Sequence, residues 1–182
     1  MSIAQRAFVW KLVALIMLSL GLRGIALAQS QLVVSSPAIA PGAEIPSDFA
    51  CTGADQSPEL TWSDAPKSTV SFALLVDDPD APGGNFTHWV VYNIPASRAS
   101  LPAAVPQNVE VPGGGRNGMN SFGHLGYNGP CPPPGKIHHY RFHLYALDST
   151  LNVDDKADAS TIQSAIKGHV LAEAELVGTF KR

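Results

Sequence analysis

The chain has 182 residues and a formal net charge of −3, from 12 Lys and Arg against 15 Asp and Glu. This length suits one domain of ordinary size, and a hydrophobic fraction of 45% is too high for a disordered chain. The acidic balance argues against a nucleic-acid-binding protein that neutralises phosphates, and 2 Cys are too few for a disulfide-framework miniprotein. With 16 Gly and 15 Pro, we expect a loop-rich fold built largely on strands.

Residues 1–28 have the pattern of a cleaved signal peptide. Arg6 and Lys11 give the segment a positive start. An apolar run follows at 12–22, and residues 26–28 read Ala-Leu-Ala, the small-residue spacing that signal peptidase recognises. As a helix, that run rises only about 16 Å, roughly half the core of a bilayer. We therefore expect export to the periplasm or outside the cell; an uncleaved membrane anchor is the alternative.

The remaining residues, 29–182, are expected to form a single domain, because they contain no internal repeat and no linker. Removing the leader takes away three of the 12 basic residues and none of the 15 acidic ones, which leaves a net charge of −6. Such a protein is not drawn to anionic membrane surfaces, and no integral membrane segment is expected after signal removal. Any contact with a lipid would therefore come from a specific pocket.

The first half of this domain is predicted to hold three strands. The Pro- and Gly-rich stretch 37–58 is typical of irregular structure, and a short strand is expected at 59–62. The clearest strand covers 70–77, where β-forming residues run up to Asp-Pro. A turn at 79–84 then leads into a strand over 86–94, which ends at a proline.

The second half begins with a long loop. Residues 95–135 contain too many Pro and Gly for a helix or a long strand, which indicates an ordered functional loop. A strand is expected over 137–147 and a short helix over 158–167, with Gly168 as its C-terminal cap. A last strand is expected over 174–180.

Alternation along the three long strands aligns one ionisable residue of each strand with an apolar face, because side chains two apart share a face. The predicted faces are Val70, Phe72, Leu74 and Val76 with Asp78; Phe86, Val90, Tyr92 and Ile94 with His88; and Tyr140, Phe142 and Leu144 with His138. The opposite side of the strand at 137–147, with His139, Arg141 and His143, is expected to be solvated. Asp78 and His138 lie at strand ends, where the mouth of a pocket would be.

We expect Asp78, His88 and His138 to converge on a binding site, although each histidine alone could be a hydrogen-bonded core residue. Two imidazoles can donate hydrogen bonds to an anion such as phosphate, and a carboxylate can orient one of them. The same residue types occur in metal sites and in acid–base catalysis. The spacing fits no helix-type metal site, however, and the sequence has no G-x-S-x-G, P-loop or H-E-x-x-H motif. We therefore expect no metal, no cofactor and no catalytic residue.

Two segments resemble the signatures of phosphatidylethanolamine-binding proteins. Residues 77–82, Asp-Asp-Pro-Asp-Ala-Pro, followed by His88-Trp89, resemble the first signature. Residues 126–135, Gly-Tyr-Asn-Gly-Pro-Cys-Pro-Pro-Pro-Gly, followed by His-His-Tyr at 138–140, resemble the second. Both occur in the order and spacing of the family, so the resemblance is specific.

The similarity extends over most of residues 31–182, and segments 51–62 and 168–180 resemble the bacterial branch, which is usually called Raf-kinase-inhibitor-like. Two features depart from the family pattern. His139 stands where an Arg is common, and the segment 117–121 looks longer than usual for its loop. Neither departure touches the two signatures.

The resemblance implies a mainly β fold, with a central antiparallel sheet packed with a smaller sheet and few peripheral helices. It also implies a small pocket that accepts phosphate or a phosphoethanolamine-type head group. By motif position, the ligand-binding residues would be Asp78, Asp80, His88, Pro130, Pro132, His138 and Tyr140. Two of them have an alternative: Asp80 could only cap backbone amides of its turn, and Tyr140 could be a core residue.

The two cysteines, Cys51 and Cys131, can pair if the protein reaches an oxidising compartment. A bond between them would tie the N-terminal segment to the pocket loop and, in the chain-entropy model, stabilise the fold by about 4.5 kcal/mol. The alternative is two unpaired thiols that pack.

Three functions from different classes remain open. The leading one is an exported protein that binds a phosphorylated small molecule or a phospholipid head group. The second is a protease inhibitor or another protein-interaction module with an unknown partner, since export argues against a kinase partner. The third is a phosphoester hydrolase that uses His and Asp, for which the sequence offers no nucleophile motif. We therefore expect a binding protein and not an enzyme.

Overall fold

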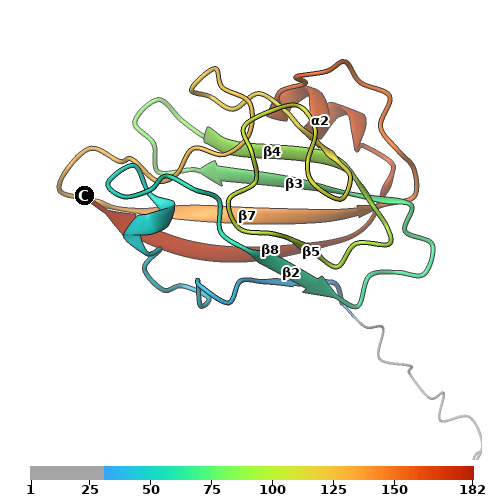
Figure 1. Cartoon of the computed structure of the whole chain (residues 1–182), viewed down its shortest axis with the longest axis horizontal. Coiled ribbons are helices and arrows are strands. Elements are labelled where there is room, and N and C mark those ends of the chain that lie inside the picture. Colours follow the sequence, from blue (N-terminus) through green and yellow to red (C-terminus); the bar gives the residue numbers. More distant parts are fainter. Residues whose placement is uncertain (1–30) are drawn as a thin grey trace, which may run out of the picture.

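A computed structural model describes residues 31–182. Its elements, in chain order, are β1 (Val33–Ser35), the 3-10 helix η1 (Ser47–Phe49), β2 (Leu60–Ser63), β3 (Ser71–Asp78), β4 (Phe86–Pro95), β5 (Ser100–Leu101), β6 (Arg116–Asn117), β7 (Ile137–Leu147), α2 (Ala159–Ala165) and β8 (Val170–Lys181). All strand pairs are antiparallel, in a five-stranded sheet of order β6-β4-β3-β7-β8 and a three-stranded sheet of order β1-β2-β5 (Figure 1). The mainly β fold with two sheets is therefore confirmed.

The long strands lie where the sequence predicts them, and β3 is buried along its whole length as the middle of the larger sheet. The predicted helix is present as α2, with the Asp158 side chain accepting a hydrogen bond from the Thr161 amide at its start. Just past its end, Gly168 adopts φ +82°, which favours glycine. The last strand, β8, is longer than expected because it pairs with the full length of β7. Its alternating Ala and Glu residues give little β signal of their own.

Two apolar clusters cover the two faces of the central sheet. One lies between the sheets and joins Phe72, Leu74 and Phe142 of the larger sheet to Leu60 and Trp62 of β2. The other includes Ala73, Leu75, Val90 and Tyr92 of the sheet and Ile162 of α2. Figure 1 shows α2 beside β4, at the opposite side of the molecule from β2. Burial on both faces explains why β3 is an uninterrupted apolar run.

The predicted face of β4 is wrong for Val90 and Tyr92, because two irregularities interrupt the pairing of β4 with β3. Val76 pairs with Trp89 whereas Asp77 pairs with Thr87, so His88 is an extra residue at this point of the ladder. As a result, Trp89 packs in the cluster between the sheets, whereas Val90 and Tyr92 pack in the cluster that includes α2. A β-bulge changes the parity of every residue beyond it, which strict alternation cannot anticipate.

Cys51 and Cys131 form a disulfide, with their Cα atoms 5.4 Å apart, as expected if the two thiols pair. The bond joins the segment after η1 to the loop that precedes β7. Within residues 31–182, no helix is long and apolar enough to cross a membrane. The predicted signal peptide at 1–28 lies outside the described residues.

Candidate ligand-binding site

A cavity of about 160 Å³ lies at one end of the central sheet. Because neighbouring strands are antiparallel, this end gathers the last residue of β3 and the first residues of β4 and β7. These strands contribute Asp78, Phe86, His88, His138 and Tyr140 to the wall. The loops complete it with Ala81, Pro82, Phe122, Cys131, Pro132 and Pro133.

Asp78 and His138 form a buried pair at the base of this cavity. The Asp78 Oδ2 atom lies 2.7 Å from His138 Nδ1, and the side chains are only 4% and 5% exposed. The second oxygen of Asp78 accepts a hydrogen bond from the Asp80 amide at 2.8 Å. Since the carboxylate is held from both sides, it fixes the orientation of the His138 ring.

His88 is held by the backbone of the loop before β7. Its Nδ1 atom lies 2.8 Å from the carbonyl oxygen of Asn128, and the residue is 3% exposed. Burial lowers the pKa of His88, and the Asn128 carbonyl and the Asp78 and Asp55 carboxylates offset this only in part. The unliganded ring is therefore neutral near pH 7.

Tyr140 presents a buried hydroxyl that has no hydrogen-bond partner within residues 31–182. Its ring stands nearly perpendicular to that of His88, with the ring centroids 5.1 Å apart. Burial raises the pKa of this hydroxyl, and the Asp78 carboxylate raises it further. Tyr140 is thus a neutral donor, and a buried donor without a partner costs about 1–3 kcal/mol. A ligand that accepts its hydrogen bond would remove this cost.

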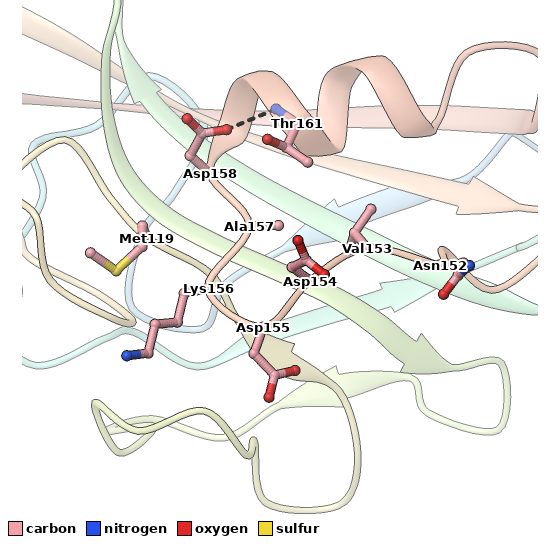
Figure 2. Close-up of a pocket in the computed structure, with 9 residues that line it drawn as sticks. All are labelled: Met119, Asn152, Val153, Asp154, Asp155, Lys156, Ala157, Asp158 and Thr161. Atoms are coloured by element: carbon pink, nitrogen blue, oxygen red, sulfur yellow. Dashed lines mark hydrogen bonds between the residues drawn. The ribbon is translucent and has the colours of Figure 1, made fainter.

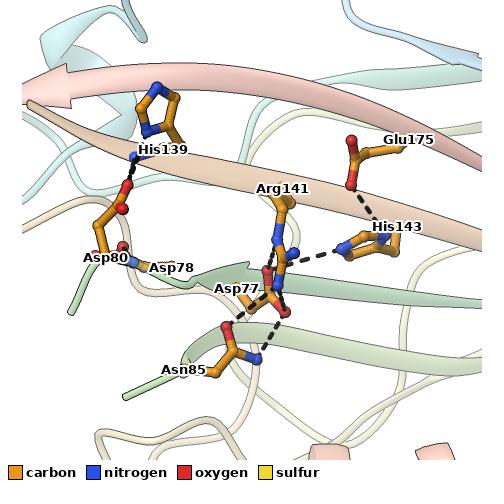
Figure 3. Close-up of polar contacts among 8 residues, drawn as sticks. All are labelled: Asp77, Asp78, Asp80, Asn85, His139, Arg141, His143 and Glu175. Carbon is orange, nitrogen blue, oxygen red and sulfur yellow. Dashed lines mark hydrogen bonds and ion pairs between the residues drawn. The ribbon is translucent and has the colours of Figure 1, made fainter. Parts of the chain in front are cut away.

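Two predicted ligand-binding residues, Asp80 and Pro130, do not line the cavity. The exposed Asp80 carboxylate accepts two hydrogen bonds from His139, from the backbone amide at 2.9 Å and from ring Nδ1 at 2.7 Å (Figure 3). These bonds lower the pKa of Asp80. Pro130 is buried, and its carbonyl accepts a hydrogen bond from the Cys51 amide. The other five predicted residues, Asp78, His88, Pro132, His138 and Tyr140, share the cavity.

Phe122, which neither strand alternation nor the signatures indicated, lies at the cavity wall and is 40% exposed. Its ring centroid is 4.8 Å from that of Phe86 and 5.5 Å from that of His88. The buried Asn120 shapes this loop, because its side-chain oxygen accepts hydrogen bonds from the amides of Phe122 and His124. An Asn that bonds the backbone two residues later is a known turn signal, and it could have indicated an ordered loop here.

The rim of the cavity, the loop segment around Gly129 and Pro130, is anchored to the segment near the disulfide. The Asp55 carboxylate accepts hydrogen bonds from the Gly129 amide at 2.6 Å and from the Asn128 side chain at 3.1 Å. Gly129 packs so closely that an added Cβ atom would lie 2.0 Å from the Phe49 carbonyl oxygen. This position therefore requires glycine, and the rim is tightly placed.

The opposite face of the same strands is not simply solvated. Asp77 is buried and forms two hydrogen bonds with the Arg141 guanidinium, at 2.8 and 3.0 Å, and a third with Asn85 at 2.8 Å (Figure 3). His143 is partly buried and lies 3.4 Å from Glu175. Of the three residues predicted to be solvated on this face, only His139 is exposed, with 54% of its side chain accessible. Arg141 is needed to pair Asp77, so this cluster stabilises the sheet behind the cavity.

A larger hollow of about 590 Å³ lies between Met119 and residues 152–158 (Figure 2). Two of its three carboxylates have partners: Asp158 caps α2, and Asp155 pairs with Arg116. In the described part of the chain, no group of three or more His, Cys, Asp or Glu residues could hold a metal ion. The hollow therefore offers no convergent set of groups, unlike the cavity at the sheet end.

Known proteins share this architecture. The model of the family described as phosphatidylethanolamine-binding protein matches residues 35–181. The chain belongs to the phosphatidylethanolamine-binding protein (PEBP) family. The match covers both signature segments and every residue of the cavity wall, so the site lies within the part of the chain that the family shares.

Individual PEBP relatives agree with this assignment. A UPF0098 protein from Methanothermobacter thermautotrophicus is 46% identical over 138 residues, which cover 76% of this chain and 91% of that protein. The UPF0098 protein YbcL of Escherichia coli is 40% identical over 140 residues, covering 74% and 76%. The crystal structures of YbcL, described as a new member of the mammalian PEBP family, and of the PEBP homologue CT736 from Chlamydia trachomatis each match with a TM-score of 0.77 and 34% identity. Each of these two matches spans 84% of this chain and 99% of the chain in the crystal structure.

Proposed function

We propose that the protein binds a small anion, of the phosphate or phosphoethanolamine type, in the cavity at the end of the central sheet. The observation that carries this proposal is the set of polar groups on an otherwise apolar wall. His88, the Asp78–His138 pair and the unpaired hydroxyl of Tyr140 all border the same space. A few convergent polar groups in an apolar pocket are typical of a ligand site.

The dimensions of the cavity favour a head group over a whole lipid. Its volume of about 160 Å³ lies below the roughly 300–1,000 Å³ of sites that enclose a drug-sized ligand. The name of the family, which refers to phosphatidylethanolamine, supports a ligand of this chemistry.

We also propose that the protein acts outside the cytoplasm. The signal-peptide pattern at 1–28 supports this, and the Cys51–Cys131 disulfide supports it independently, because such bonds persist in oxidising compartments. LppC of Mycobacterium tuberculosis, 43% identical over 155 residues, carries a lipoprotein name, which also favours export in this group of proteins.

Binding, and not turnover, is the activity we propose. Among residues 31–182, the wall of the cavity contains no Ser or Thr, and its only cysteine, Cys131, is held in the disulfide. A hydrolase of this design would need water as its nucleophile and one of the imidazoles as a general base. A chromogenic phosphodiester tests this directly: we expect no release of nitrophenol above the uncatalysed rate.

The proposal is tested by calorimetric titration of the mature protein with inorganic phosphate and with phosphoethanolamine. We expect saturable binding at one site, weakened at least tenfold in His138→Ala. His169→Ala is the matched control, because His169 Nδ1 also lies 2.8 Å from a carboxylate, that of Asp148, but on the surface. Equal affinity in the two variants would contradict the proposed site. No binding by the folded wild-type protein would contradict the function and favour a protein partner.

A further inference from the structure

The hydrogen bonds of His88 determine which ring nitrogen carries its proton. A carbonyl oxygen can only accept, so Nδ1 of His88 must donate to the carbonyl of Asn128. A neutral imidazole has a single N–H, so Nε2 then carries a lone pair. In the neutral state, His88 therefore offers a ligand an acceptor and no donor, which an anion without a proton of its own cannot use.

The rest of the wall cannot balance the charge of an anion. The Asp78–His138 pair carries a net charge of −1 when the ring is neutral and zero when it is protonated. Tyr140 adds one neutral donor, and of residues 31–182 no Lys or Arg lines the cavity. An anion that enters without a proton would leave an unbalanced charge in a buried, largely apolar space, which is costly.

The surroundings of His88 allow it to become charged once an anion is present. Asp78 faces it from β3, Tyr140 from β7, and Asp55 lies behind the rim loop. Its other neighbours, the rings of Phe86 and Phe122, are apolar. Of the two histidines, only His138 has a carboxylate within hydrogen-bond distance. His88 is therefore the group whose charge depends on the ligand.

We propose that the cavity takes up one proton with its ligand, on Nε2 of His88, and therefore selects singly charged anions over doubly charged ones. This inference rests on the proposed function of anion binding. With His88 protonated, the polar groups of the wall carry a net charge of zero or +1. At +1 that charge balances one negative charge on the ligand, and in either state a second negative charge stays unbalanced. A phosphodiester is singly charged at every relevant pH, whereas a phosphate monoester, with a second pKa of about 6, is doubly charged at pH 8.

Isothermal titration calorimetry with dimethyl phosphate tests the proton uptake, because this probe has no proton of its own to exchange. Titrations at pH 7.5 in Tris and in triethanolamine give the number of protons taken up from the difference in binding enthalpy, and neither buffer is an anion. We expect about one proton per site and an affinity that falls about tenfold per pH unit above pH 7. Methyl phosphate should bind at least tenfold more weakly than dimethyl phosphate at pH 8.

His88→Gln separates proton uptake from binding, because its amide N–H₂ donates at every pH. This variant should bind dimethyl phosphate more weakly than the wild type does at pH 6, because its side chain is neutral, and with no proton uptake and a flat pH profile. His169→Gln should behave like the wild type. If His88→Gln does not fold, NMR titration of the wild-type His88 ring gives the same answer, since its pKa should rise on ligand binding. Binding without uptake, or equal affinity for the two phosphates at pH 8, would overturn the inference and leave the proposed function intact. If folded wild-type protein binds neither probe between pH 5.5 and 8.5, both the inference and the proposed function fail.

Discussion

Removing the disulfide should lower the stability of the fold much more than the ligand affinity of the cavity. The Cys51–Cys131 bond closes a loop with a sequence separation of 80, for which the chain-entropy model gives about 4.5 kcal/mol. Cys51 is exposed and Cys131 is half-buried, so alanine at both positions removes little packing. The double variant Cys51→Ala/Cys131→Ala should therefore lose about 2–4.5 kcal/mol of unfolding free energy, almost all of it through the greater freedom of the unfolded chain.

Ligand affinity should change much less, because the rim of the cavity has other anchors. The Cys51 amide donates to the Pro130 carbonyl at 3.1 Å, and the Gly129 amide donates to Asp55 at 2.6 Å. Neither bond uses sulfur, so we expect less than a tenfold loss of phosphate affinity. Urea denaturation followed by tryptophan fluorescence measures the stability, with reduced wild-type protein as the control. A loss below about 1 kcal/mol in both samples would refute the loop-entropy reasoning.

Three further changes probe the site and its supports. Tyr140→Phe removes a buried hydroxyl without a partner, so thermal unfolding should show a protein that is as stable as the wild type or more stable, by up to about 1–3 kcal/mol, while anion affinity in titration falls about tenfold. A clear loss of stability would show that the hydroxyl is already bonded. Gly129→Ala should lower the unfolding free energy by about 1–3 kcal/mol, because the added Cβ atom meets the Phe49 carbonyl. Gly83→Ala should leave it unchanged in the same melt, because nothing lies within 4 Å of the added atom. Asp158→Ala should cost about 1 kcal/mol at pH 7 by removing the cap of α2. Hydrogen bonds from Thr161 and Ser160 lower the pKa of Asp158 in the folded protein. The ionised cap therefore stabilises the fold above the unfolded pKa of about 3.9, and this stabilisation is lost as the pH falls through the lower folded pKa. The difference in stability between wild type and variant should therefore shrink in melts as the pH falls below the unfolded pKa of about 3.9, and a constant difference down to pH 2 would contradict the assigned cap.

Alternation predicted the meeting of Asp78, His88 and His138, but for one of them the reasoning was incomplete. Asp78 and His138 lie on unbroken parts of their strands, and there the two-residue period holds. His88 lies in the cavity beside Phe86 as alternation predicts, but the bulge before Trp89 places Trp89 and Val91 on the cavity side of the sheet and Val90 on the other side. Without that bulge, the consecutive residues His88 and Trp89 would lie on opposite sides of the sheet. Bulges depend on tertiary pairing, so one strand's sequence does not reveal them.

The walls contributed by loops were the least predictable part of the site. The signature segment supplied Pro132, but its neighbour Pro130 turns its carbonyl to the Cys51 amide and stays outside the cavity. Phe122 belongs to the loop that resembled no signature, and Asn120 fixes its position through bonds to the backbone. The bond of Pro130 joins residues far apart in the sequence, and composition and spacing carry no information about it. The bond of Asn120 is local, so it predicts a turn but not that Phe122 meets the cavity.

The arrangement of charge at the sheet end follows from pairings that strand geometry makes specific. Three acidic residues lie within four positions, and each finds its own partner on β7: Asp77 with Arg141, Asp78 with His138, and Asp80 with His139. Successive residues of a strand face opposite sides, so the Asp77 pair lies behind the sheet and the Asp78 pair lies in the cavity. The charge of Asp77 is thus balanced by a guanidinium outside the site, and Asp80 is balanced at the surface. The cavity is left with one carboxylate and two imidazoles, so its net charge is set by protons on histidine and changes with pH and with the ligand.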